Sequence, residues 1–158
     1  MMKAPLPLAT AIGGVALAFT ELEASLKECC IALAAIRGVD PMVADVLVRR
    51  HDIESLAAIL TDMAGLHTDD ADVVAVVGDI AADVRRVVRR RDRFHRTGPG
   101  IVSVACYTGL RSETRDVLST VLALTEHLHD GDIATPGFTP AAAVDNVVPL
   151  RPELRIVT

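Results

Sequence analysis

Residues 8–36, LATAIGGVALAFTELEASLKECCIALAAI, place apolar side chains at steps of 4, 3, 4, 3, 4, 3, 4 and 3. The positions of this apolar seam are Leu8, Ile12, Val15, Phe19, Leu22, Leu26, Cys29, Leu33 and Ile36. Such spacing returns to one side of an α-helix at each turn, whereas a half-buried strand alternates at every second residue. The segment therefore predicts one long amphipathic helix. Gly38 is expected to end it, because glycine is favoured just past a helix C-terminus.

The same segment shares some features with a secretory leader. Met1–Lys3 carry a positive charge, an apolar stretch follows to Phe19, and Ala16-Leu17-Ala18 resembles a cleavage site. The seam crosses that site without a change of phase, however, and a removable leader has no reason to share register with the mature chain. The apolar run is also shorter than the ~20 residues that a membrane span needs. We therefore expect a helix of the folded domain, a cytoplasmic protein and no membrane association.

The rest of the chain predicts four more helices, each with a polar residue suited to capping its start. They are about 41–50 after Asp40, 53–66 after Asp52, 71–96 after the polar run 67–70, and 112–129 from Ser112. Between the last two helices, the run Thr97-Gly98-Pro99-Gly100 is expected to end the helix abruptly. The run that follows, Ile101–Tyr107, is rich in β-compatible residues. We expect the latter run to be a short strand or an extended crossover.

Composition agrees with one helical domain. The chain has 158 residues, 51% of them apolar but only 3% aromatic, so Ala, Val, Leu and Ile must fill the core. The fold class predicted is all-α, a single bundle of four to five helices over 1–134 with an extended or disordered tail over 135–158. Three cysteines make no disulfide framework, and Cys29 and Cys30 sit in an apolar helical pattern as small hydrophobes. No metal-ligand spacing or phosphate loop is present, so no cofactor and no metal are expected.

Charge is concentrated in residues 84–98, VRRVVRRRDRFHRTG, although the whole chain carries a net charge of −5. Solvation and the helix dipole explain most of these arginines, because cations are favoured near a helix C-terminus. Arg91 needs another explanation. It follows Val73, Val77, Ile80, Val84 and Val87 in the apolar seam of this helix. A guanidinium at a core-facing position needs a partner or a wet cleft, and His95 lies one turn further on nearly the same face.

An arginine followed a few residues later by a histidine at a helix end resembles the motif of the HEPN superfamily, R-x(4–6)-H on a small helical bundle. Arg90 precedes His95 with four intervening residues, and Arg89 with five. The run Thr20–Leu26 is also similar to first helices of bacterial members, and the resemblance covers about residues 8–130. The arginine-polar pair most like the family's is Arg91-Asp92, which leaves only three residues before His95. Helical geometry favours Arg91 as the motif arginine and family spacing favours Arg90, so both stay candidates.

The resemblance implies metal-independent RNA cleavage in a cleft formed by a homodimer, with Arg90, Arg91 and His95 as catalytic candidates. Histidine titrates near neutral pH and can move a proton to or from the ribose, while a guanidinium can hold the scissile phosphate. The surrounding arginines are expected to bind RNA or a partner: Arg86, Arg89, Arg93 and Arg96. A nuclease of this toxin or defence type would be expected to have a cognate antitoxin as a partner. In the alternative that stays open, the bundle is a non-catalytic module of the same fold for dimerisation or for binding a partner.

Overall fold

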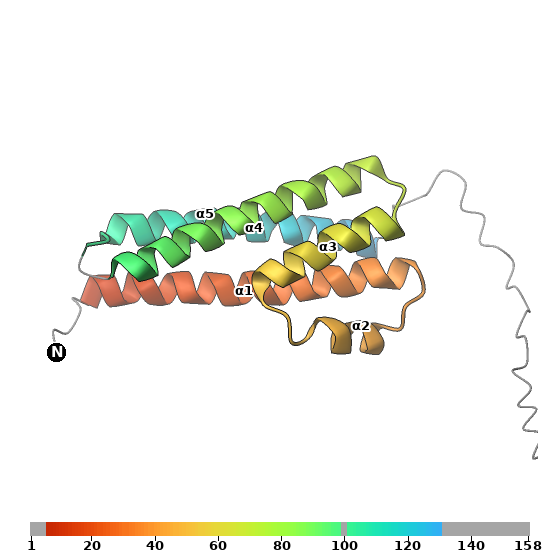
Figure 1. The fold of residues 1–158 in the computed structure, drawn as a ribbon, viewed down its shortest axis with the longest axis horizontal. Helices are drawn as coiled ribbons and strands as arrows, with labels where there is room; N and C mark the ends of the chain where they lie inside the picture. Colours follow the sequence, from red (N-terminus) through yellow and green to blue (C-terminus); the bar gives the residue numbers. More distant parts are fainter. Residues whose placement is uncertain (1–5, 99–100, 131–158) are drawn as a thin grey trace, which may run out of the picture.

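The computed structural model describes residues 6–98 and 101–130, which form five helices (Figure 1). These are α1 (Leu6–Ile36), α2 (Pro41–Val48), α3 (Ile53–His67), α4 (Ala71–Thr97) and α5 (Val104–His129). The predicted all-α bundle with a long N-terminal helix is confirmed. The predicted tail over 135–158, and the boundary drawn at 134, lie outside the described residues.

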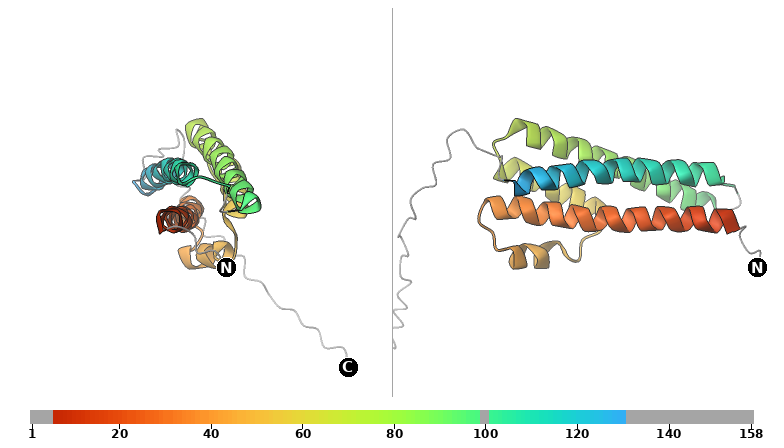
Figure 2. Two further views of the ribbon diagram at one scale, coloured as in Figure 1. Left: turned by 90° about the vertical axis from the view of Figure 1, so that its left-hand side faces the viewer. Right: turned by 180° about the vertical axis from the view of Figure 1, so that it is seen from behind.

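Four of the helices enclose the core. α1 packs against α5 and α3, and α4 packs against the same two helices from the other side. α1 and α5 run side by side in the same direction, and α4 returns in the opposite direction (Figures 1 and 2). α2 lies outside this arrangement and packs against α1. It occupies the connection between α1 and α3, along the C-terminal half of α1 (Figure 1).

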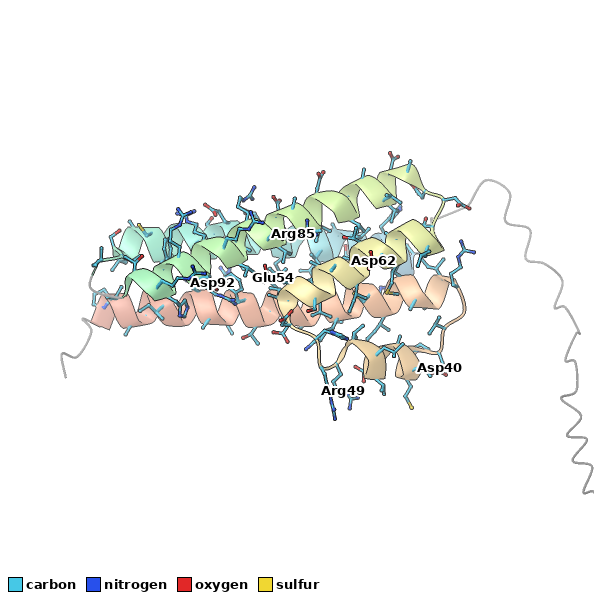
Figure 3. The ribbon with its side chains drawn as sticks, in the orientation of Figure 1. Asp40, Arg49, Glu54, Asp62, Arg85 and Asp92 are labelled. Atoms are coloured by element: carbon cyan, nitrogen blue, oxygen red, sulfur yellow. The ribbon has the colours of Figure 1, made fainter. Side chains whose placement is uncertain are left out.

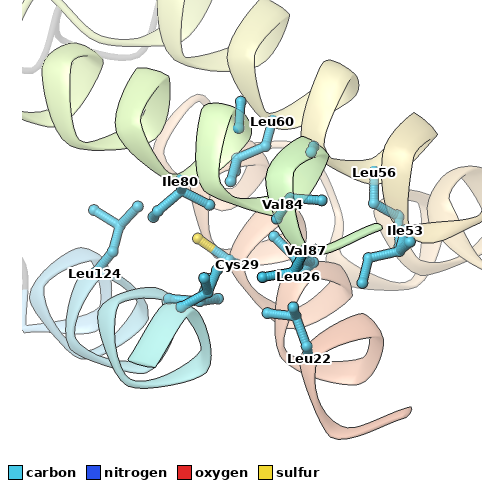
Figure 4. Packing of buried hydrophobic residues seen from close by; sticks show 14 of the residues in the cluster. Leu22, Leu26, Cys29, Ile53, Leu56, Leu60, Ile80, Val84, Val87 and Leu124 are labelled. Atoms are coloured by element: carbon cyan, nitrogen blue, oxygen red, sulfur yellow. The ribbon is translucent and has the colours of Figure 1, made fainter. Parts of the chain in front are cut away.

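The apolar seams predicted for α1 and α4 meet in the centre of the bundle (Figure 4). Leu22, Leu26 and Leu33 are completely buried, and Val77 and Val84 face them from the α4 side of the core. The remaining seam positions before Arg91 are buried or partly buried as predicted, with one exception in α1. Ile36 is 37% exposed because it lies in the last turn, at the end of the bundle.

Three aspartates begin helices: Asp40 and Asp52 at the predicted positions, and Asp70 from within the polar run 67–70. Asp40, Asp52 and Asp70 each accept backbone N–H bonds from the first turn of α2, α3 and α4. The Ser55 backbone N–H, bonded to the Asp52 carboxylate, holds the pKa of that group below its ordinary value. Gly38 and Gly98 follow α1 and α4 with φ of 74° and 84°, a left-handed conformation that side chains with a Cβ rarely adopt.

The expected strand or extended crossover at Ile101–Tyr107 is wrong, and so is the expected helix start at Ser112. Ser103 is the N-cap of α5, and its hydroxyl accepts from the Cys106 backbone N–H. The buried face of α5 keeps its 3-4 spacing up to the start of the helix, where Tyr107 and Leu110 are its first members. Burial of that face outweighs the weak strand preference of the β-branched residues in this run.

α1 is long and apolar enough to cross a membrane by length and composition alone, over Pro7–Ile36. The core helix of a bundle and a leader sequence can have the same composition. The expectations of a cytoplasmic protein and of no membrane association therefore stay predictions.

A pair of leucines in α1 tests the assignment of its buried face. Leu26→Ala removes a completely buried side chain and is expected to lower the free energy of unfolding by about 3 kcal/mol, because it leaves a cavity. Leu17→Ala in the same helix is the matched control, since Leu17 is 55% exposed and its loss should change stability by less than about 0.5 kcal/mol. Urea unfolding followed by circular dichroism measures both. Equal losses in the two variants would contradict the assignment.

Candidate functional site

The bundle has a cleft where α3 stops covering it. α3 has 15 residues and α4 has 27, so α3 spans only one half of the bundle (Figure 1). On the other half, a cleft of about 620 Å³ opens between α1, the end of α4 and the start of α5. Ile53, the first residue of α3, forms its inner limit. Figure 3 labels Asp92 on this half of α4, beyond the start of α3 at Glu54.

Arg91 occupies the seam position predicted for it and lines this cleft. Its guanidinium lies over the ring of Phe19 on α1, with 4.8 Å between Cζ and the ring centroid. Its Nε and Nη2 both donate to Asp92 Oδ1 at 3.1 Å. A third of the side chain, 33%, stays exposed. The charge in the seam thus has an aromatic neighbour, a carboxylate and contact with solvent, which together reduce the cost of its partial burial.

His95 lines the same cleft, one helical turn beyond Arg91. The side chain is exposed, and it makes no hydrogen bond or ion pair with any residue that the structure describes. Both ring nitrogens are therefore available to a ligand or to water.

Arg90 is directed away from this cleft. It forms an ion pair with Glu113 on α5, and its Cζ lies 5.5 Å from the centroid of the Phe94 ring. Neighbouring residues of an α-helix are about 100° apart around its axis, which is enough to turn Arg90 toward α5 and Arg91 toward α1. Of the three catalytic candidates, the structure brings Arg91 and His95 together and places Arg90 at the α4–α5 contact.

The four arginines expected to bind RNA or a partner lie on the outer side of α4. Arg86 forms an ion pair with Asp83 at 2.8 Å. Arg89, Arg93 and Arg96 are exposed, have no ion pair within the described part of the chain, and line a shallow surface hollow of about 330 Å³. Arg96 lines this hollow and the cleft as well. A basic surface is thus continuous with the cleft rim.

The sequence reasoning missed the aromatic character of this site. The whole chain contains three Phe, one Tyr and no Trp, and Phe19, Phe94 and Tyr107 all line the cleft. Phe94 and Tyr107 pack edge to face with ring centroids 5.3 Å apart. The sequence did contain a signal for this aromatic site. Aromatic residues are rare in this chain, and Phe94 falls inside its arginine-rich segment. Glu113 gave no signal, since nothing in its local sequence marks it as a partner of Arg90.

Cys29 and Cys30 are buried core residues, in keeping with their predicted role as small hydrophobes. Burial raises the pKa of Cys29 to about 11. A hydrogen bond with Thr125 lowers this pKa, but its effect is smaller than that of burial. Burial, with the neighbouring Cys29, raises the pKa of Cys30 to about 12. Among the described residues, no group of three or more His, Cys, Asp or Glu side chains is arranged to hold a metal ion.

Comparisons with known proteins find no matching family model and no matching curated protein or solved structure. The geometry of the cleft is therefore the basis for assigning a function.

The cysteines give a test of burial by chemistry. At pH 8 a thiol with a pKa near 11 is ionised in only about one molecule in a thousand, and the thiolate is the reactive form. We expect iodoacetamide to modify the partly exposed Cys106 first and to leave Cys29 and Cys30 largely unmodified in the folded protein. Intact mass gives the number of adducts, and the same reaction in 6 M guanidinium is the control, in which all three should react. Equally fast labelling of all three in the folded protein would contradict the core assignment.

Proposed function

We propose that this protein is a metal-independent endoribonuclease of the HEPN type that acts as a dimer, with Arg91 and His95 as its reactive pair. The observation that supports it best is that both side chains line one open cleft while His95 has no partner in the described part of the chain. A free imidazole beside a fixed guanidinium is suited to act on a bound ligand.

The chemistry follows from the two groups. In RNA cleavage, the 2′-hydroxyl loses its proton as its oxygen attacks the adjacent phosphorus. The 5′-oxygen of the next nucleotide gains a proton as its bond to phosphorus breaks. An imidazole can carry out either transfer, and a guanidinium can stabilise the charge that develops on the phosphoryl oxygens. His95 is the one histidine lining the cleft in the described part of the chain. A second protomer would supply the second imidazole, which accounts for the proposed dimer.

The arginines on the outer side of α4 fit the same proposal. Arg89, Arg93 and Arg96 form a local basic surface on a chain whose net charge is −5, so attraction of a phosphate backbone would be confined to this region. Arg90 is assigned a structural role at the contact with Glu113. That assignment departs from the family spacing, which would select Arg90 as the motif arginine.

Activity on RNA tests this proposal directly. The purified protein is expected to cleave a single-stranded RNA in the presence of EDTA, and His95→Ala and Arg91→Ala should each lower the rate at least about 100-fold, because each removes one group of the reactive pair. His127→Ala is the matched control: it removes an exposed histidine of α5 that lies about 25 Å along the helix from the cleft residue Leu110. Equal cleavage by the wild type and His95→Ala would reject the proposal.

The second candidate is a non-catalytic module that dimerises or binds a protein partner, and α2 favours it. Met42, Val43, Val46 and Leu47 lie on one face of this short helix, each more than half exposed. Clustered large apolar side chains on a surface are typical of interaction sites. α1 is the one helix that makes extensive contacts with α2, so no other helix of the described residues covers this face.

Charged substitutions on α2 test the second candidate. If this face mediates self-association, Met42→Glu with Val46→Glu is expected to convert a dimer into a monomer that keeps the helical circular dichroism spectrum of the wild type, because both side chains are solvent-exposed in the single chain. Leu66→Glu is the control, since Leu66 is a similarly exposed apolar residue on α3. Light scattering after size exclusion gives the mass of each variant. An unchanged dimer in the α2 variant would exclude this face as its interface.

A further inference from the structure

The position of Arg91 is fixed from two directions. Phe19 supports its guanidinium on one side, at 4.8 Å from Cζ to the ring centroid, and Asp92 holds the Nε and Nη2 edge. Phe19 itself is only 7% exposed, so the supporting ring is part of the core. The exposed third of Arg91 borders the cleft. A planar cation is thus presented to the cleft in a defined place, without the loss of side-chain freedom that binding normally imposes.

The cleft beside it suits a planar, weakly polar group better than it suits a phosphate alone. Its walls are largely apolar, with Ile12 and Val15 on α1, Phe94 on α4, and Tyr107 and Leu110 on α5. Its volume of about 620 Å³ is in the range of small-molecule sites. Charged groups line two walls: Arg91, Asp92, His95 and Arg96 lie at the end of α4, and Glu23, whose carboxylate is paired with Lys27, lies on α1.

A ligand that fits both halves of this site has a flat aromatic body joined to an anionic group, as a nucleotide does. We propose that the cleft of each protomer binds one unpaired nucleobase of a single-stranded RNA, stacked on the face of the Arg91 guanidinium. The adjoining phosphate would lie near His95, Arg96 and the Nη1 edge of Arg91, which the hydrogen bonds to Asp92 do not use. Unstacked bases in single-stranded RNA are commonly held on guanidinium planes and aromatic side chains. Bases in a duplex are already stacked on their neighbours and cannot enter. The inference rests on the proposed function and adds how the substrate is held.

Binding of uncleavable oligonucleotides tests this inference separately from catalysis. The probes are a fluorescein-labelled 2′-O-methyl RNA 8-mer, a labelled backbone of equal length and charge that is abasic at all of its positions, and the 8-mer annealed to its complement. In ~50 mM salt, the wild-type protein should bind the intact single strand about tenfold more tightly than the abasic strand, since one stacked base contributes a change of that order. The duplex should bind no better than the abasic strand.

Two variants assign the preference to Arg91. Arg91→Lys keeps the positive charge but has no planar group, and it should bring the affinities for the intact and abasic strands within about twofold of each other. Phe19→Leu keeps an apolar core residue but removes the supporting ring, and it should reduce the same ratio. Arg85→Lys is the matched control and should keep the tenfold ratio, because Arg85 is an exposed residue of α4 that lines neither the cleft nor the basic hollow.

The outcomes separate this inference from the proposed function. Equal affinity of the wild type for intact and abasic strands, or no binding of either, overturns the inference, whether or not the protein cleaves RNA in EDTA. A tenfold preference that Arg91→Lys abolishes supports the inference, even if the wild type and His95→Ala cleave RNA equally and the proposed function fails. A tenfold preference that survives in Arg91→Lys also overturns it, because the base would then bind elsewhere.

Discussion

The apolar face of α1 is longer than the helix that covers it, and the site depends on this mismatch. α1 has 31 residues, whereas α3, one of the three helices packed on it, has 15. Beyond the start of α3, the face of α1 that includes Phe19 would lie open to water. The side chain of Arg91 extends from α4 across this gap and covers the ring. The same side chain therefore completes the core and forms the wall of the cleft.

This double role explains why arginine is suitable at a position where the rest of the seam is valine or isoleucine. A guanidinium is more weakly hydrated than an ammonium group and can lie against an aromatic ring while its edges make hydrogen bonds. Complete burial would still be costly, but the open cleft leaves a third of the side chain in contact with water. A lysine could supply the charge without covering Phe19 in the same way. The arginine is tolerated because the bundle is incomplete at this point.

Much of the fold could be predicted from the sequence, because periodic apolar spacing reports directly on which face of a helix is buried. The 3-4 spacing located the core of α1 and α4, and Asp40, Asp52 and Asp70 marked helix starts. The error at residues 101–107 arose because β-branched composition was given more weight than the spacing of Tyr107 and Leu110. The expected tail lies outside the described residues.

The site was harder to predict, since it depends on contacts between distant segments. Spacing along the chain could not decide between Arg90 and Arg91, because their partners lie on other helices. Glu113 is 23 residues from Arg90 in the sequence. The aromatic ring below Arg91 belongs to the first helix, and its role becomes visible only when the folded bundle brings the end of α4 opposite α1. Local sequence identified the unusual residue but not the groups that give it a function.

The positions of the cleft and of α2 also constrain how a dimer can form. α2 and the pocket beneath it contact Cys30 and Ala34 in the C-terminal half of α1, whereas the cleft is bordered by residues 12–23 in its N-terminal half. A two-fold dimer joined through α2 would leave each cleft open and separate from the other, as a binding module requires. A nuclease that shares two His95 side chains in one groove needs a contact at the opposite half of the bundle, around the end of α4. The location of the dimer interface therefore discriminates between the two functions, independently of any assay of activity.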